Sequence, residues 1–577
     1  MTATGERDEG EDGARGPVWA IADAYVEALA EHEPEAAQAL GHPDGPLLAD
    51  IGPAWMLERY ELQGRTLADL DALPSDAGDE TLRAALHERL ERERLLFDTG
   101  FTTRLIAGLA SPVHLIRYSF EGSELTPDAA GARLLARLRA VPEAVGQYIE
   151  TLRWSRDQGA SGRFSGTGVA PARQIDTLAA QVESWASRDW FGSLAIAPGV
   201  DAALRGGFRA AADDARAALL ALAAFLRDEL RSSAPVEDGV GEEVYADLAA
   251  AMLGACVDLA DTYAFGWSEL ERLTAEATAL AEGLGGTGVD PVRSAGESLD
   301  ADPRYRLEGV PAIRAWLSAR VAETTDALAG TAFDLPPTVR DVECIVSESS
   351  AGVVYYTPSP PDGSAPSRIV WTIPSGVPVA ATWQEVSSVH HEGLPGHHLE
   401  HVVNAANTGL HPWQRHLCQI HGYAEGWAHY AEQLADELGL VRDQAERLGM
   451  VLGQIWRAVR IVADIGLHTG WPIPRNTVLD DTAWTPEAAR RLLIDRALVE
   501  PTLAGFEVDR YLGWPGQALA FKVGARLWND ARDAWAAERG DAFTLRDFHR
   551  EALGYGPMGL GPLRDLLLRG GDSPAEG

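Results

Sequence analysis

The sequence predicts a mainly α-helical protein with one small antiparallel β-sheet, on three observations. Ala, Leu, Arg and Glu recur at helical period from about residue 17 to residue 330. Three short runs rich in β-branched and aromatic residues follow between residues 342 and 373. Helical periodicity returns at residue 382 and continues towards the end of the chain. We therefore expect helices on both sides of the sheet.

These changes in pattern divide the chain into three regions. Residues 1–16 are polar and acidic with interspersed glycine, which predicts a disordered tail. Residues 17–333 are expected to form a helical N-terminal region, interrupted by Gly- and Pro-rich breaks at 161–168 and 234–241. Residues 334–577 are expected to form a second region that combines the sheet with helices and holds the histidine-rich segment described below. The helical first half would cover this second half.

The three predicted strands span residues 342–346, 352–356 and 368–373, with a turn-rich segment at 358–364. The run at 352–356 ends in two tyrosines, and a strand at the edge of a sheet can pair with an extended peptide. Tyr356 is therefore a candidate substrate contact. Simple membership of the sheet is the alternative role for this strand.

Composition and charge exclude several classes of protein. The formal net charge of −37 repels nucleic acid and anionic membrane surfaces, so neither is an expected partner. The three cysteines are widely separated, which is typical neither of a disulfide framework nor of a cysteine-rich zinc site. The first residues lack an apolar core, and no run reaches the roughly 18 apolar residues that a membrane span needs. We expect a soluble, cytoplasmic protein.

Histidine is concentrated in one segment. Nine of the fifteen histidines lie between residues 390 and 429, around the run His-His-Glu-Gly-Leu-Pro-Gly-His-His that begins at His390. Imidazole is the commonest metal-ligating side chain, and a glutamate beside a ligand is the usual base in zinc-dependent hydrolysis. This segment therefore predicts a metal site, with Glu392 next to its first ligand.

A helix is expected to carry the first ligand. Thr382 and Glu385 match a capping box, so a helix that begins there would hold His391 and Glu392 in its third turn. Two zinc ligands on one helix are normally four residues apart, on the same face. No histidine lies four residues after His391.

Two histidines compete for the second ligand position. His397 lies about 120° off the face of His391 in a regular helix, and His398 lies on the correct face but roughly 10 Å away. Pro395 cannot donate its backbone hydrogen bond, and Gly396 tolerates conformations that other residues avoid. A two-residue bulge before His397 would bring it to the position normally four residues along. This geometry favours His397 over His398.

The third ligand is expected on the following helix, where Glu425 lies 28 residues after His397. The small residues around Glu425 would let another helix approach closely. His421 and His429 lie one turn on either side and would support the carboxylate. The alternative is a solvated pair between Glu425 and His429 at i, i+4. Three protein ligands would leave a fourth position open for water.

The pattern His-Glu-x-x-Pro-Gly-His-His, followed by Glu-Gly-Trp-Ala-x-Tyr-x-Glu, resembles a large bacterial family that is grouped with the gluzincin metallopeptidases. The resemblance continues in residues 456–468 and 509–524 and covers most of residues 340–570. It implies a gluzincin-like architecture and one zinc ion per chain, held by His391, His397 and Glu425 with Glu392 as base. The motif is two residues longer than the typical gluzincin pattern. Many relatives resemble exported lipoproteins, whereas this sequence shows no such signal.

Four further residues are candidates for roles around the metal. Tyr511 and His468 are candidate donors to the oxyanion that forms during hydrolysis. His468 shares a helical face with Arg460 and Asp464, and a buried structural ion pair is the alternative role for this face. Lys522 is the one lysine in the sequence. We regard Arg460 and Lys522 as candidate substrate contacts.

Three functions are compatible with this pattern. The leading hypothesis is a zinc-dependent metallopeptidase that hydrolyses small peptides, with Glu392 activating a metal-bound water. The first alternative is a metal-dependent amidohydrolase that acts on a non-peptide amide or a specialised metabolite. The second is a non-catalytic helical binding protein with a vestigial or structural metal site. A closed structural site would use four protein ligands, so an open three-ligand site beside Glu392 argues against the last hypothesis. The pattern predicts no oligomeric state.

Overall fold

Helices dominate the architecture, which confirms the predicted mainly α class. The structure, a computed structural model, describes residues 16–42, 44–75, 77–120, 129–196, 203–348, 354–361, 363, 365–373 and 379–569. The predicted tail at residues 1–16 therefore lies, except for Gly16, outside the described residues, as do Gly352 and Val353 of the second predicted strand. Among the described helices, none combines the length and the apolar character needed to cross a membrane.

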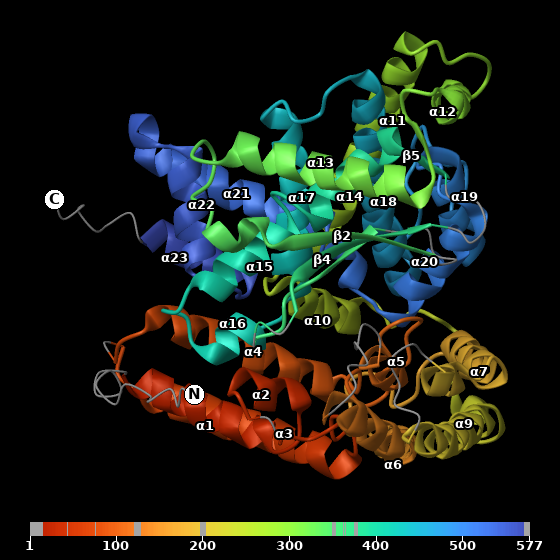
Figure 1. Cartoon of the computed structure of the whole chain (residues 1–577), viewed down its shortest axis with the longest axis vertical. Coiled ribbons are helices and arrows are strands. Elements are labelled where there is room, and N and C mark those ends of the chain that lie inside the picture. The colour runs from red at the N-terminus through yellow and green to blue at the C-terminus, as the bar shows by residue number, and fades with distance from the viewer. Residues whose placement is uncertain are drawn as a thin grey trace.

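The first helices gather along one side of the molecule (Figure 1). Many begin at a proline, whose fixed φ suits the first helical turn. These elements are α1 (Pro17–Ala30), α2 (Pro34–Ala39), α3 (Pro53–Ala72), α4 (Glu80–Asp98), α5 (Pro112–Tyr118), α6 (Ala129–Ala160), α7 (Ala172–Ser187), α8 (Trp190–Ser193), η1 (Leu194–Ile196), α9 (Arg205–Asp228) and η2 (Leu230–Ser233).

Most of the remaining elements lie along the other side, with α10 between the two groups and α16 beside α2 and α4 (Figure 1). Before the strands come α10 (Glu242–Leu253), α11 (Leu259–Gly283), α12 (Pro291–Ala301), β1 (Arg306–Glu308), α13 (Val310–Leu328) and η3 (Pro337–Arg340). The strands that follow are β2 (Val342–Glu348), β3 (Val354–Thr357), β4 (Ser367–Ile373) and β5 (Val379–Ala381). The last elements are α14 (Thr382–Glu392), α15 (His397–Ala406), α16 (Pro412–His416), α17 (His421–Glu437), α18 (Gln444–Thr469), α19 (Pro486–Arg496), α20 (Pro501–Gly513), η4 (Gln517–Leu519), α21 (Lys522–Arg539), η5 (Gly540–Ala542), α22 (Leu545–Gly554) and α23 (Leu560–Arg569).

The predicted boundary at residues 333 and 334 does not separate two hydrophobic cores. One core joins side chains of α1 and α4, such as Val26 and Leu86, to Trp371 of β4 and Leu567 of α23. A second core lies between α11 and α18 and includes residues from both sides of the boundary. A third core is confined to α5–α9 and its neighbours in the first half. Packing therefore ties the two halves of the chain together.

The sheet is mixed, so the prediction of an antiparallel sheet was wrong. Its strand order is β2-β4-β3, with β2 parallel to β4 and β3 antiparallel to β4. The most apolar strand takes the centre: Ile369, Trp371 and Ile373 of β4 are all buried, and a central strand is covered on both edges. As a result β3 lies at an edge of the sheet, with one side free of strand partners among the described residues.

A second, two-stranded sheet joins β1 to β5 and sets the start of α14. The strands are antiparallel and pair Leu307 with Ala380. The predicted capping box is not formed, because the pairing runs to Ala381 and Ala381 becomes the N-cap residue. The side chain of Thr382 instead donates to the carbonyl of Tyr305, at 3.1 Å. The start of this helix could be predicted from the sequence, but the sheet that determines it could not.

Candidate metal centre

A complete break between two helices positions the histidines, in place of the bulge predicted within one helix. Helix α14 ends at Glu392 and α15 begins at His397, so four residues connect them. Gly396 lies so close to α14 that a Cβ there would approach the carbonyl oxygen of His391 to 1.9 Å. Its amide donates to the carbonyl of His390, at 3.0 Å. Only glycine permits this approach, which turns the chain sharply enough to place His397 beside His391.

Helix α17 holds this connection in place. The indole Nε1 of Trp427 donates to the carbonyl of Pro395, at 2.9 Å. Gly426 on the same helix packs directly against α21, where a Cβ would meet the backbone of Gly524 at 2.7 Å. The expectation that small residues around Glu425 admit another helix is therefore confirmed. The Glu-Gly-Trp run thus supplies a carboxylate, a helix contact and an anchor for the break.

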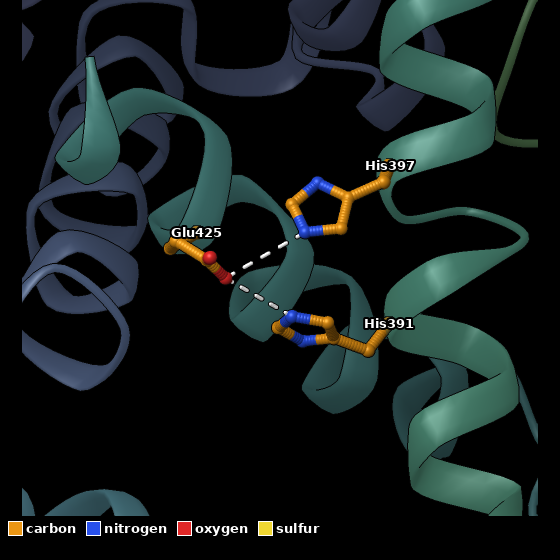
Figure 2. Close-up of side chains that lie close together, drawn as sticks. All are labelled: His391, His397 and Glu425. Carbon is orange, nitrogen blue, oxygen red and sulfur yellow. Dashed lines mark hydrogen bonds and ion pairs between the residues drawn. The ribbon is translucent and has the colours of Figure 1, made fainter. Parts of the chain in front are cut away.

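His391, His397 and Glu425 converge on one point from three different helices (Figure 2). The Nε2 atom of His391 lies 3.1 Å from Oε2 of Glu425, and Nε2 of His397 lies 3.6 Å from the same oxygen. The two imidazole rings are nearly perpendicular, with their centroids 4.9 Å apart. All three ligand atoms lie within 4.8 Å of one another, and no other group of three such residues occurs in the part of the chain that the structure describes.

The spacing of these atoms suits a tetrahedral metal ion. Two ligands at zinc distances of about 2.0–2.1 Å and tetrahedral angles lie about 3.3 Å from each other. The two distances to Glu425 fall on either side of that value. Two imidazole nitrogens and one carboxylate oxygen also form a donor set that zinc binds in catalytic sites. The residues present therefore fit a zinc ion.

Glu432, for which the sequence predicted no role, orients the first imidazole. His391 Nδ1 donates to Oε1 of Glu432, at 2.8 Å, and the Glu432 side chain is fully buried. His429 Nδ1 also contacts this oxygen, at 3.2 Å, so His429 supports Glu432 and not Glu425 as expected. Glu432 lies seven residues after Glu425, two turns along α17 and on the same face. This seven-residue spacing is the feature of the sequence from which a role for Glu432 beside Glu425 could have been predicted.

The electrostatics of the cluster follow from these contacts. Burial disfavours protonation of His391, but its contacts with Glu425 and Glu432 outweigh burial and raise its pKa to about 10. Burial likewise raises the pKa of Glu432, yet the neighbouring His429 and Arg457 charges and the His391 contact hold it well below its usual range. His391 and His397 keep the pKa of Glu425 well below its usual range against the effect of burial. Both carboxylates are therefore charged.

Glu392 lies at the end of α14, between the metal cluster and the edge strand β3. Burial raises the pKa of Glu392, and the nearby His391 and His397 act in the opposite direction. The backbone N–H of Tyr356 is directed at its carboxylate and also lowers this pKa. A partly exposed carboxyl group thus sits beside the candidate ligands, within contact of a strand that has a free edge.

His398 and the side chain of Tyr356 lie on the other side of α15. His398 Nε2 donates to the carbonyl of Val339, at 2.8 Å, and its Nδ1 lies 3.3 Å from the hydroxyl of Tyr356. That hydroxyl donates to Ser367 Oγ, at 3.0 Å. The structure therefore groups His397, not His398, with the other two candidate ligands. Tyr356 approaches the site through its backbone and not through its ring.

Tyr511, His468 and Arg460 belong to a buried network around Glu507. The Tyr511 hydroxyl donates to Glu507 Oε2, at 2.9 Å, and Arg460 donates to the same oxygen, at 2.8 Å. His468 Nε2 donates to the carbonyl of Tyr511, at 2.9 Å. Asp464, the third member of the predicted helical face, accepts from Tyr245 and from the Gly516 amide, and its Oδ1 lies 3.7 Å from Nε2 of His468. The hydroxyl of Tyr511 and Nε2 of His468, both predicted oxyanion donors, are thus engaged within this network.

Lys522 connects three helices. Its ammonium lies 3.0 Å from Oε2 of Glu269 on α11 and donates to Oε1 of Gln454 on α18, also at 3.0 Å. The side chain is 3% exposed. A buried ammonium with two partners fastens α21 to its neighbours, and these contacts give it a structural role.

The fold and the cluster together define a helical protein with a candidate metal centre built from two histidines and a glutamate. The chain belongs to a bacterial protein family of unknown function, DUF885, whose model matches residues 34–567. No curated protein matches the chain by sequence.

Two solved structures share the fold over nearly the whole chain. A candidate lipoprotein from Colwellia psychrerythraea is 19% identical, with a TM-score of 0.79 over 96% of this chain and 99% of its own. A candidate lipoprotein of unknown function from Shewanella oneidensis is 16% identical, with a TM-score of 0.69 over 95% of this chain and 99% of its own. At these identities the likeness establishes the fold alone.

Proposed function

We propose that this protein is a zinc-dependent metallopeptidase of the gluzincin type that hydrolyses small peptides. The observation that carries the proposal is the convergence of His391, His397 and Glu425, with the carboxyl group of Glu392 directly beside them. Three protein ligands leave a coordination position open, as catalytic zinc sites require. A free carboxyl group next to that position is the residue type that hydrolysis needs as a base.

Each residue has a distinct part in this proposal. His391, His397 and Glu425 would hold the zinc, and Glu432 keeps the His391 ring in the tautomer whose Nε2 faces the ion. When bound, zinc would polarise a peptide carbonyl and lower the pKa of a water molecule towards neutrality. Glu392 would accept the proton of the attacking water and transfer it to the nitrogen of the leaving amine.

The edge strand supports a peptide substrate over a compact amide. Strand β3 lies at the edge of the sheet, and its Tyr356 N–H faces Glu392. Since the N–H and C=O of one residue point to the same side of a strand, the carbonyl of Tyr356 also faces the site. An extended peptide could pair with this free edge and present a bond to Glu392. A cytoplasmic location remains a prediction.

Metal analysis with a matched pair of variants tests the proposal. We expect wild type to carry one zinc ion per chain and to cleave members of a short-peptide library. Glu392→Gln should keep the zinc and lose activity by roughly 10²–10⁴-fold, because the isosteric amide cannot accept the proton. The control, Glu343→Gln on the exposed face of β2, should be fully active. Zinc-loaded wild type that cleaves no peptide in the library would contradict the proposal and favour a non-peptide amide.

A further inference from the structure

Three arginines surround one aromatic ring beside the candidate metal ligands. The ring of Phe521 stacks on His391, with centroids 6.0 Å apart and planes 16° from parallel. The guanidinium carbons of Arg457, Arg460 and Arg510 lie 5.8, 4.2 and 5.7 Å from the centroid of the same ring. The cationic cluster therefore begins one side chain away from the imidazole of His391.

Carboxylates balance this cluster only in part. Glu507 pairs with Arg460 and Arg510, at 2.8 and 3.2 Å. Within the described part of the chain, Arg457 forms one ion pair, a 3.7 Å contact with Glu432, which already accepts hydrogen bonds from His391 and His429. Three guanidinium groups thus share ion pairs with two carboxylates.

The same arginines have hydrogen-bond donors with no acceptor among the described residues. These buried atoms are Nε of Arg457, Nη1 of Arg460 and Nε of Arg510. Burial also lowers the pKa of Arg457, although the charges of Glu432, Glu507 and Glu425 act against it. A buried donor without an acceptor is costly, whereas an anion that accepts from it is bound strongly. The cluster is therefore suited to receive an anionic group.

Arg457 is the member of the cluster that contacts Glu432, the carboxylate that orients His391. The side chains of Arg457 and Arg510 are each 15% exposed, compared with 6% for Arg460. A planar guanidinium matches a carboxylate with two parallel hydrogen bonds. The anion that every unmodified short peptide carries is its C-terminal carboxylate.

We infer that Arg457, backed by Arg460 and Arg510, binds the C-terminal carboxylate of the peptide and makes the protein a carboxypeptidase. This inference rests on the function proposed above. In the reaction, the water oxygen bonds to the carbonyl carbon and the C–N bond breaks. The N-terminal part leaves with a new carboxylate. The released C-terminal fragment takes a proton on its amine and keeps the carboxylate that Arg457 holds.

Paired substrates test this assignment. We would compare N-blocked tripeptides that end in a free carboxylate with the same peptides as C-terminal amides. Wild type should prefer the free acids by roughly 10–100-fold in kcat/KM, the range expected for hydrogen bonds to a charged group. Arg457→Ala should lose this factor on the free acids and keep its activity on the amides. Arg447→Ala, which removes an exposed arginine from the same helix, should behave as wild type.

A binding measurement separates this inference from the proposed function. Zinc-loaded Glu392→Gln should bind free acids more tightly than amides in calorimetry, and adding Arg457→Ala should abolish the difference. If wild type hydrolyses nothing but this difference is observed, the anion site stands and the peptidase proposal fails. If wild type hydrolyses both series equally well, the peptidase proposal stands and the carboxylate site is refuted.

Two further results would also overturn the inference. If Arg457 only neutralises Glu432, Arg457→Ala will weaken zinc binding and reduce hydrolysis of free acids and amides alike. If the site receives an acidic side chain, peptide amides that contain an internal glutamate will be cleaved with the same kcat/KM as the free acids. Should Arg457→Ala fail to fold, Arg457→Lys retains the charge without the planar fork. It should lose part of the preference for free acids while binding zinc as wild type does.

Discussion

His391 and Glu432 face each other across 2.8 Å, with the imidazole Nδ1 donating to the carboxylate. With Nδ1 donating to Glu432, Nε2 is the ring nitrogen that faces Glu425 and His397 and that would coordinate a bound zinc ion. The contact also joins α14 to α17, and Ser387 of α14 adds a second buried hydrogen bond to the other oxygen of Glu432. Glu432 is therefore as much a part of the centre as the three candidate ligands.

Replacing Glu432 should weaken zinc binding without removing a ligand. Glu432→Gln removes the charge that holds His391 and should lower zinc affinity by roughly 10–100-fold. Competition with a chromogenic chelator measures this change. Glu437→Gln, which alters an exposed carboxylate on the same helix, is the control and should leave affinity unchanged. Equal affinity in all three proteins would show that the His391–Glu432 contact does not affect the metal.

The two adjacent histidines should behave differently. His397→Ala removes one of three candidate ligands, so the isolated protein should contain little or no zinc. His398→Ala removes a buried hydrogen bond to Val339 and should lower the free energy of unfolding by about 1–3 kcal/mol while zinc is retained. Elemental analysis and urea unfolding measure the two effects. Zinc loss in His398→Ala with retention in His397→Ala would reverse the assignment.

Gly396 should tolerate no side chain. A Cβ would overlap the carbonyls of His390 and His391, so Gly396→Ala must displace α15 from α14. We expect a loss of about 1–3 kcal/mol in the free energy of unfolding, together with weaker zinc binding. Gly206→Ala is the matched control, because a Cβ there meets no atom of the described residues, and this substitution should stabilise α9 by about 0.4–1 kcal/mol. If Gly396→Ala binds zinc and has the same free energy of unfolding as wild type, Gly396 does not lie as close to α14 as described.

The charge of Glu507 should make stability depend on pH. Burial disfavours this carboxylate, but Arg460 and Arg510 outweigh burial and hold its pKa at about 2. A depressed pKa contributes stability above the unfolded value of about 4.3, and the contribution is lost as pH falls towards 2. Glu507→Gln should therefore cost about 3–5 kcal/mol at pH 6, and less as the pH falls to 3.

Urea unfolding of both proteins between pH 6 and pH 3 measures this difference. The exposed Glu229, whose contacts with Arg153 and Arg156 also lower its pKa to about 2, provides the comparison. Glu229→Gln should cost at most about 1 kcal/mol, because solvent screens an exposed pair. A gap between wild type and Glu507→Gln that does not change with pH would indicate that packing, and not charge, accounts for it.

The helical class and the grouping of His391, His397 and Glu425 could be predicted from local pattern. Helical period and the positions of Pro395 and Gly396 are properties of short segments. The strand order could not be predicted, because the central place of β4 depends on which strand the surrounding helices bury. The pairing of Arg460 with Glu507 was missed for a similar reason, because Glu507 lies on another helix, 47 residues away, and no sequence period connects the two residues. Tyr511 lies four residues after Glu507 on α20, so this contact has a helical spacing that the sequence does contain.

The connection between α14 and α15 has a consequence for recognising distant relatives. A continuous helix dictates the number of residues between two side chains that share a face, whereas a loop can gain or lose residues and still return to the same point. Proteins with longer or shorter linkers could therefore assemble an equivalent triangle of donors. Searches for such proteins should compare the spatial arrangement of the donor atoms and should not require a constant motif length.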